Sequence, residues 1–274
     1  MPSAQLPDGR IYYQLEGRGD LPALVFSNSL GTTLEMWDPQ VGPFSEHFRV
    51  LRYDTRGHGR SAVTPGDYSI AQLATDLLQL LDLLQLERVY FCGLSMGGAI
   101  GIHLGSHAPQ RFHKLVLCNT AAKFGTAETW NARIRAVQAG GMNAVAGSVI
   151  ERWFTSGFRA AHPLETQATQ AMLEAANPQG YLSCCAAVRD VDERRSLGAV
   201  RVPCLVLTGT QDPVTPPAEA RYLVDNIPGA QYAEVPAAHL SNIEARDDFN
   251  RYVLGFLLAG RSDRWTNPSV TAKE

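Results

Sequence analysis

The chain has 274 residues, enough for one or two domains at about 150 residues each, and its 45% hydrophobic and 19% charged residues predict a folded core. Its 24 Lys and Arg residues and 27 Asp and Glu residues give a formal net charge of −3. This balance excludes the basic excess of most nucleic-acid-binding proteins and the polybasic patch that attracts an anionic membrane, so we expect neither partner.

The first half of the chain alternates strand and helix signals. Short apolar runs that end in polar turns, a pattern typical of buried strands, occupy residues 23–29, 48–54, 88–95 and 114–121. Ser69 and Gln72 form a capping box ahead of leucines at helical spacing, which predicts an amphipathic helix. A second helix is predicted from Gly97 to about His107. Strands that alternate with helices in this way predict an α/β fold with a mostly parallel sheet flanked by helices.

The pattern changes between residues 123 and 197. This stretch lacks a convincing buried strand and is rich in Ala, Gln, Arg and Glu, which predicts an insertion of several short helices. Strand and helix signals resume at residues 202–212, 217–226, 231–236 and 247–258. We therefore predict an α/β core made of residues 1–122 and 198–260, a helical insertion at 123–197 and a mobile polar tail at 261–274.

The N-terminal sequence and the cysteines favour a location in the cytoplasm. No basic segment followed by an apolar run opens the chain, and no apolar stretch approaches the length of about 18 residues that a membrane span needs. The five cysteines include no CxxC pair, and their odd number favours free thiols in a reducing cytoplasm. The sequence also has no G-x-G-x-x-G, no P-loop and no metal-ligand cluster, so we expect no cofactor and no metal.

The sharpest chemical signal is Gly93-Leu94-Ser95-Met96-Gly97, a G-x-S-x-G motif between a predicted strand and a predicted helix. Such a turn forces the serine into an uncommon backbone conformation and exposes its hydroxyl, and the flanking glycines avoid a clash. The alternative is a glycine-rich turn with an incidental serine. The strand before the motif and the helix after it favour Ser95 as a nucleophile.

A serine hydroxyl is a weak nucleophile and needs an adjacent base. His239 follows the predicted strand 231–236, at the carboxyl edge of the sheet, and is the candidate base. His103 and His107 lie four residues apart on a helix, yet the sequence offers them no third ligand and no H-E-x-x-H glutamate. We therefore assign His103 and His107 to surface or packing roles.

The acid of a serine–histidine system should follow a strand between the serine and the histidine. Asp212 does so, after a glycine turn, and would hold the imidazole tautomer and stabilise the imidazolium. The alternative is that Asp212 only caps its turn. The presence of Ser95 and His239 favours the catalytic role, and Asp190 and Asp192 are weaker candidates because they lie in the helical insertion.

A tetrahedral intermediate needs two preorganised backbone N–H groups. One should be the amide of Met96, the residue after the nucleophile. The second should come from the small polar loop at residues 27–31, where we assign the N–H of Leu30. A simple polar turn is the alternative explanation for this loop.

Taken in order, these motifs resemble the α/β-hydrolase family. Residues 54–61 resemble that family's D-x-R-G-x-G-x-S turn, which has a structural role. The resemblance extends over nearly the whole chain up to about Gly260, and the insertion resembles the helical cap of that fold.

A narrower resemblance rests on several segments. Residues 26–32, 36–37, 48–59, 92–98, 117–121 and 241–244 are similar to the 3-oxoadipate enol-lactonases of the bacterial β-ketoadipate pathway. This resemblance implies a serine hydrolase that opens a small anionic enol-lactone to 3-oxoadipate through an acyl-enzyme. It also implies that Trp130 and Arg133, three residues apart in the cap, face the substrate, with Arg133 binding its carboxylate.

Other activities of the same fold remain open from sequence alone, because the fold does not fix the function. They are a general carboxylesterase, a hydrolase of carbon–carbon bonds and, as a side activity, a perhydrolase. A ligand-binding protein that has lost turnover is a different class of function. The ordered set of Ser95, Asp212 and His239 argues against that last alternative.

Overall fold

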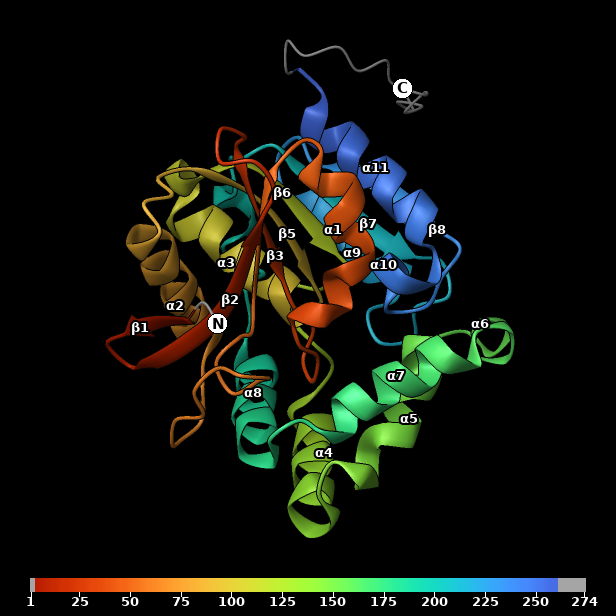
Figure 1. Cartoon of the computed structure of the whole chain (residues 1–274). Helices are drawn as coiled ribbons and strands as arrows, with labels where there is room; N and C mark the ends of the chain where they lie inside the picture. The colour runs from red at the N-terminus through yellow and green to blue at the C-terminus, as the bar shows by residue number, and fades with distance from the viewer. Residues whose placement is uncertain (1–2, 261–274) are drawn as a thin grey trace.

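The computed structural model describes residues 3–260, in which eight strands form a single sheet with helices on both faces (Figure 1). The strand order is β1-β2-β4-β3-β5-β6-β7-β8. The strands are β1 (Ser3–Leu6), β2 (Gly9–Glu16), β3 (Ala23–Ser27), β4 (Arg49–Tyr53), β5 (Val89–Leu94), β6 (Phe112–Cys118), β7 (Cys204–Gly209) and β8 (Gln231–Val235).

The sheet is parallel from β4 through β8 and antiparallel at the β1–β2 edge, which confirms the predicted mostly parallel α/β architecture. Strands β3, β5 and β7 are buried along their whole length, because helices cover both of their faces. The β1–β2 hairpin is an addition that the strand signals did not predict. Alternate residues of β1 are exposed, as expected of a half-covered edge strand.

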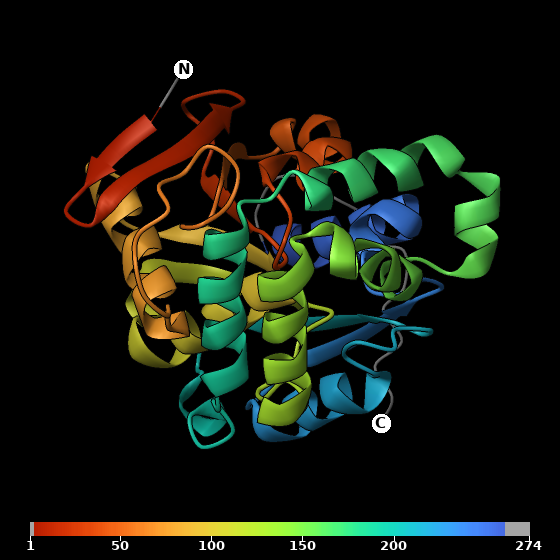
Figure 2. The same ribbon diagram turned by 90° about the horizontal axis from the view of Figure 1, so that it is seen from below.

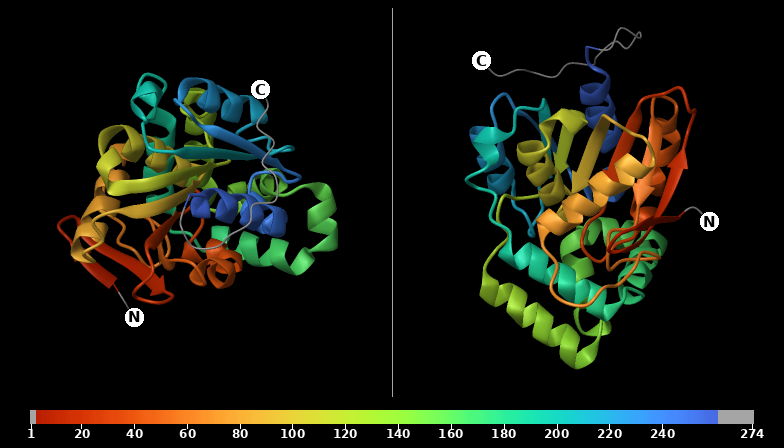
Figure 3. Two further views of the ribbon diagram at one scale, coloured as in Figure 1. Left: turned by 90° about the horizontal axis from the view of Figure 1, so that it is seen from above. Right: turned by 90° about the vertical axis from the view of Figure 1, so that its left-hand side faces the viewer.

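Helices cover the two faces of the sheet, as the two views of Figure 3 show. Helices α2, α3 and α9 lie on one face, and α1 and α11 pack together on the other. Their bounds are α1 (Asp38–Ser45), α2 (Ile70–Leu83), α3 (Met96–His107), α9 (Pro217–Asn226), α10 (Ser241–Glu244) and α11 (Arg246–Leu258). The short 3-10 helices are η1 (Leu34–Trp37), η2 (Pro109–Arg111) and η3 (Leu197–Ala199).

The segment between β6 and β7 folds into helices that we call the cap helices (Figure 2). They are α4 (Ala127–Gly140), α5 (Asn143–Trp153), α6 (Ser156–Ala161), α7 (Pro163–Glu174) and α8 (Pro178–Asp190). The N–H of Leu240 donates to the carbonyl of Trp153 at 3.0 Å, and the N–H of Tyr68 donates to the carbonyl of Ser183 at 3.1 Å. Both contacts hold the cap helices against loops at the carboxyl ends of the parallel strands.

Local signals account for several element boundaries. The Ser69 hydroxyl accepts the N–H of Gln72 at 3.1 Å and starts α2, as the capping pattern predicts. Helix α9 spans the predicted residues 217–226, whereas β6 begins at Phe112, two residues before the predicted strand. The predicted tail at 261–274 lies outside the described residues. Within residues 3–260, no helix combines the length and apolar character that crossing a membrane requires.

Candidate active site

Ser95 occupies the turn between β5 and α3. Its backbone has φ 57° and ψ −114°, a region that L residues rarely adopt and that costs about 1–3 kcal/mol. The N–H of Ser95 donates to the carbonyl of Cys118 at 2.9 Å, and its own carbonyl accepts the Thr120 hydroxyl at 2.7 Å. These bonds to the end of β6 hold the strained turn. The Ser95 hydroxyl does not cap α3, although serine commonly does so, and it is therefore available for other chemistry.

The glycines of the motif are required by close approach. A Cβ on Gly93 would overlap the carbonyl oxygen of Gly97, and a Cβ on Gly97 would overlap the carbonyl oxygen of Ser27. Every larger residue at either position would push α3 away from β3 and β5. The steric reason for the G-x-S-x-G pattern is confirmed.

His239 and Asp212 form a buried pair. The Nδ1 of His239 lies 2.8 Å from Oδ2 of Asp212, and the two side chains are 1% and 0% exposed. The other carboxylate oxygen accepts the backbone N–H groups of Val214 and Thr215, at 2.7 and 3.1 Å. Burial by itself would raise the pKa of Asp212, but the His239 ring and the surrounding hydrogen bonds outweigh it, so this pKa lies below its ordinary value. A carboxylate accepts a hydrogen bond from Nδ1–H, and in that tautomer of His239 Nε2 carries no proton.

Asn119 connects this pair to the serine turn. It follows β6 directly and adopts a positive φ of 44°. Its amide donates to Oδ2 of Asp212 at 2.9 Å and to the carbonyl of Ala238 at 3.2 Å, and its oxygen accepts the Ser241 hydroxyl. Because the preceding residue, Cys118, accepts the N–H of Ser95, the end of β6 contacts both parts of the site. Asn119 was not predicted as a site residue, although it follows a buried strand directly, as residues of such sites often do.

Two backbone N–H groups near Ser95 have no acceptor within residues 3–260, those of Leu30 and Met96. The N–H of Gly97 donates to the carbonyl of Asn28 at 3.0 Å, which brings the loop after β3 beside the start of α3. Met96 is the first residue of α3, where helix geometry leaves the N–H unpaired. The neighbourhood of Ser95 therefore offers two unoccupied donors, one from each segment.

Trp130 and Arg133 lie together on α4. The Arg133 guanidinium stands 4.7 Å from the centre of the Trp130 ring, and the indole N–H donates to the carbonyl of Phe124 at 2.8 Å. Both side chains are half-buried. Arg133 also interacts with Tyr181 of α8, whose ring lies against Gly31, next to Leu30. Within residues 3–260, no carboxylate forms an ion pair with Arg133, so its positive charge is available to an anion.

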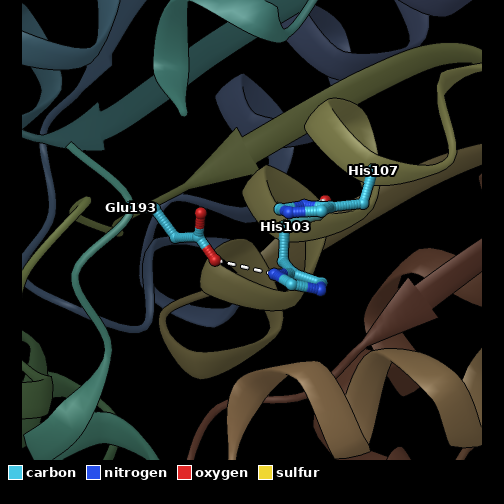
Figure 4. Close-up of side chains that lie close together, drawn as sticks. All are labelled: His103, His107 and Glu193. Carbon is cyan, nitrogen blue, oxygen red and sulfur yellow. Dashed lines mark hydrogen bonds and ion pairs between the residues drawn. The ribbon is translucent and has the colours of Figure 1, made fainter. Parts of the chain in front are cut away.

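A second group of titratable side chains lies toward the other end of α3, about 12 Å or more along the helix from Ser95 (Figure 4). His103 Nδ1 is 2.7 Å from a carboxylate oxygen of Glu193, and the His107 ring stacks on His103 with centroids 4.1 Å apart. Glu193 lies close enough to be a third potential ligand, so the expectation that His103 and His107 lack one is wrong. The two rings are inclined by only 18°, which does not aim their in-plane lone pairs at one point. This geometry fits an ion pair with a stacked ring.

Comparison with known proteins identifies the family of this chain. The sequence profile described as the alpha/beta hydrolase fold matches residues 22–246. The 3-oxoadipate enol-lactonase 2 of Acinetobacter baylyi is 42% identical over 246 residues, which are 90% of this chain and 92% of that protein. The crystal structure of the enol-lactonase from Burkholderia xenovorans LB400 has a TM-score of 0.92 and 43% identity, covering 93% of this chain and 99% of that chain.

A thermophilic esterase from Thermogutta terrifontis, solved with malate bound, is a more distant relative. It has 28% identity and a TM-score of 0.85, and the match covers 91% of this chain and 93% of that chain. The agreement in sequence with the lactonases and in structure with all of these proteins extends over both the core and the cap helices. The chain therefore belongs to the α/β-hydrolase fold family and, within it, to the family of the 3-oxoadipate enol-lactonases.

Proposed function

We propose that the protein is a carboxylic ester hydrolase that opens 3-oxoadipate enol-lactone to 3-oxoadipate in aromatic-compound catabolism. The observation that carries this proposal is the buried Asp212–His239 pair, connected through the end of β6 to the strained Ser95 turn, in a chain 42% identical to an enol-lactonase. Ser95, Asp212 and His239 act as a catalytic triad. Of the described residues, those at 3–122 and 198–260 form the catalytic core, and those at 123–197 form a cap over it.

The first half of the reaction forms an acyl-enzyme. The Ser95 hydroxyl oxygen attacks the lactone carbonyl while Nε2 of His239 takes its proton. The negatively charged Asp212 stabilises the imidazolium without accepting a proton itself. The tetrahedral intermediate then collapses, the ring C–O bond breaks, and the enol oxygen leaves with a proton from His239. An enolate is less basic than an alkoxide, so this departure needs little acid assistance.

The second half releases the product. The ring-opened enol tautomerises to a ketone, which makes return to the lactone unfavourable. His239 then removes a proton from water, the water oxygen attacks the acyl carbon, and Ser95 leaves with the proton. The proposed reaction needs water as its second reactant and includes no cofactor.

Leu30 and Met96 form the oxyanion hole of this mechanism. Their unoccupied N–H groups lie in adjacent segments, joined by the Gly97–Asn28 hydrogen bond. Donors that are already fixed in a buried site stabilise a developing oxyanion without reorganisation, which accounts for a large share of catalysis in acyl transfer.

Arg133 binds the carboxylate of the substrate, and Trp130 forms an apolar wall beside it. Two observations support this role: within residues 3–260 no carboxylate pairs with Arg133, and Tyr181, with which Arg133 interacts, lies against Gly31. Arginine suits a carboxylate because its planar fork donates two parallel hydrogen bonds. The five cysteines are free thiols, which fits our proposal that the enzyme works in the reducing cytoplasm.

The test is a spectrophotometric assay of enol-lactone hydrolysis with wild type and Ser95→Ala. Ser106→Ala, at the other end of the same helix, is the matched control. We expect rapid loss of lactone absorbance with wild type and Ser106→Ala, and essentially none with Ser95→Ala. If wild type left the lactone intact but cleaved aryl esters through Ser95, it would be a general esterase and the lactonase proposal would fail.

A further inference from the structure

His58 is a buried histidine that the mechanism above does not use. It lies in the turn after β4 and is 2% exposed. Its Nε2 accepts the backbone N–H of Gly31 at 2.8 Å. Gly31 directly follows Leu30, whose N–H is half of the proposed oxyanion hole. A buried side chain is thus attached to the loop that must hold an oxyanion donor in place.

This contact fixes the protonation state of His58. Because Nε2 accepts the Gly31 N–H with its lone pair, it carries no proton, and in the neutral ring the proton sits on Nδ1. Nδ1 lies 3.4 Å from the carbonyl of Arg56 and 3.8 Å from Sγ of Cys184. Burial lowers the pKa of His58 to about 4 and raises the pKa of the Cys184 thiol, so both side chains are neutral near pH 7. A neutral imidazole can accept the Gly31 N–H, and an imidazolium cannot.

The cap helices close this region to solvent. A Cβ on Gly180 of α8 would overlap the carbonyl of Gly57, so α8 packs directly on the His58 turn. Tyr181 of α8 and Leu173 of α7 lie against Gly31 in the same way. Water therefore has little access to replace a missing acceptor. A buried N–H left without a partner costs about 1–3 kcal/mol, which favours movement of the loop.

The neighbouring amides of the loop do not duplicate the role of His58. The N–H of Ser29 faces the sulfur of Met36 at 3.4 Å, a weak acceptor, and the N–H of Thr32 closes a turn onto the carbonyl of Ser29 at 3.2 Å. Only the two backbone dihedrals of Leu30 separate its N–H from the peptide plane that carries the Gly31 N–H. The direction of the Leu30 N–H thus depends on where the Gly31 N–H is held.

We propose that His58 is a positioning residue, which directs the Leu30 N–H toward the tetrahedral intermediate by accepting the N–H of Gly31. It does not touch the substrate. The inference rests on the proposed function, since it requires Leu30 to be an oxyanion donor. It applies equally to every ester that Ser95 attacks.

The test compares His58→Gln with His58→Asn. Both variants place an amide in the same buried space, but the glutamine oxygen extends about as far as Nε2, whereas the asparagine oxygen ends near Nδ1. Loss of one oxyanion donor costs about 10²–10³ in kcat, and displacement of a donor should cost less. We expect His58→Asn to lower kcat about 10- to 100-fold and His58→Gln about threefold, with KM unchanged in both. The assays use the enol-lactone and p-nitrophenyl acetate.

A second readout separates positioning from folding. An organophosphonate bonded to Ser95 places an oxygen in the oxyanion hole, so its inactivation rate should fall in parallel with kcat. Leu80→Ala, a core substitution in α2 away from the site, is the control: it should lower Tm and leave kcat within about twofold. Equal rates for His58→Gln and His58→Asn, or wild-type kcat in His58→Asn, would overturn the inference. If wild type failed on the lactone while the two variants still differed on the aryl ester, the proposed substrate would be wrong and the role of His58 would stand.

Discussion

The sheet and the cap helices contribute to the site in different ways. In the sheet region, the whole residues Ser95, Asp212 and His239 are 7%, 3% and 1% exposed, and hydrogen bonds to the end of β6 and to Asn119 hold Ser95 and Asp212. In the cap, Trp130 and Arg133 are half-buried and stack on each other. The groups that we propose to break the bond are therefore fixed by backbone geometry. The residues that we propose to bind the substrate lie on a helix surface, which can change without disturbing the sheet.

The two regions meet at a small number of polar contacts. Glu244 accepts the N–H of Ala238 at 2.9 Å and the N–H of Thr155 at 3.2 Å, so one carboxylate ties the loop before His239 to the start of α6. The next four predictions test whether the sheet region and the cap helices have separate roles.

Removing the base has the largest expected effect. His239→Ala should lower kcat by about 10⁴-fold or more, because the Ser95 hydroxyl loses its proton acceptor. The Ser95→Ala/His239→Ala double variant should be no slower than either single variant, since the two groups act as a unit. Steady-state kinetics on the enol-lactone measures both. A double variant slower by the product of the two single effects would show that these residues act separately.

Asp212→Asn should lower kcat by about 10³- to 10⁴-fold, because an amide does not hold the proton of His239 on Nδ1. KM should change little, since the cap residues are untouched. Asp192→Asn is the matched control: Asp192 is one of the two weaker candidate acids in the sequence, and it pairs with Arg194 and Lys123 at the surface. Loss of activity in Asp192→Asn and not in Asp212→Asn would reverse the assignment of the acid.

Acid should destabilise the protein through His58. Its pKa is lowered from the ordinary 6.5 to about 4, so the unfolded chain binds a proton that the folded chain does not. The contribution of neutral His58 to the free energy of unfolding is therefore fully present above about pH 6.5, and it is lost as the pH falls toward 4. At about 1.4 kcal/mol per pKa unit, the loss from this group is about 3 kcal/mol. Denaturant unfolding at pH 7 and pH 4.5 should show a smaller pH effect in His58→Gln than in wild type, and an unchanged effect would contradict the neutral, buried state.

Glu244→Gln should have the smallest effect of the four. The glutamine oxygen can still accept a hydrogen bond, but the charge that strengthens the contacts to Ala238 and Thr155 is lost. We expect kcat/KM to fall about 3- to 10-fold. Glu165→Gln, on the exposed side of α7, is the control and should leave kcat/KM unchanged. Equal activity of both variants would show that this contact between sheet and cap is not needed for turnover.

The proposed catalytic residues could be identified from the sequence because each lies within four residues of the end of a strand with a strong apolar signal. Ser95, Asp212 and His239 follow β5, β7 and β8, and the carboxyl ends of parallel strands meet at one edge. The β1–β2 hairpin was not predicted, because a half-exposed edge strand has a weaker pattern than a buried one. These differences follow from how much of each strand is covered.

Contacts between distant segments could not be predicted from local patterns. Asn119 has no spacing motif, and its role depends on β6 lying between β5 and β7. Glu193 reaches His103 from 90 residues away in the sequence. The attachment of Gly31 to His58 depends on the pairing of β3 with β4. Each of these contacts is fixed only when the sheet order is known.

The division between sheet and cap is tested most directly by two variants on two substrates. Ser95→Ala and Arg133→Gln would be assayed on the anionic enol-lactone and on p-nitrophenyl acetate, which has no carboxylate. We predict that Ser95→Ala abolishes both activities, whereas Arg133→Gln raises KM for the lactone about 10- to 100-fold and leaves the neutral ester unchanged, as loss of a charge-assisted contact would. An unchanged KM for the lactone in Arg133→Gln, or an equal loss on both substrates, would contradict the account.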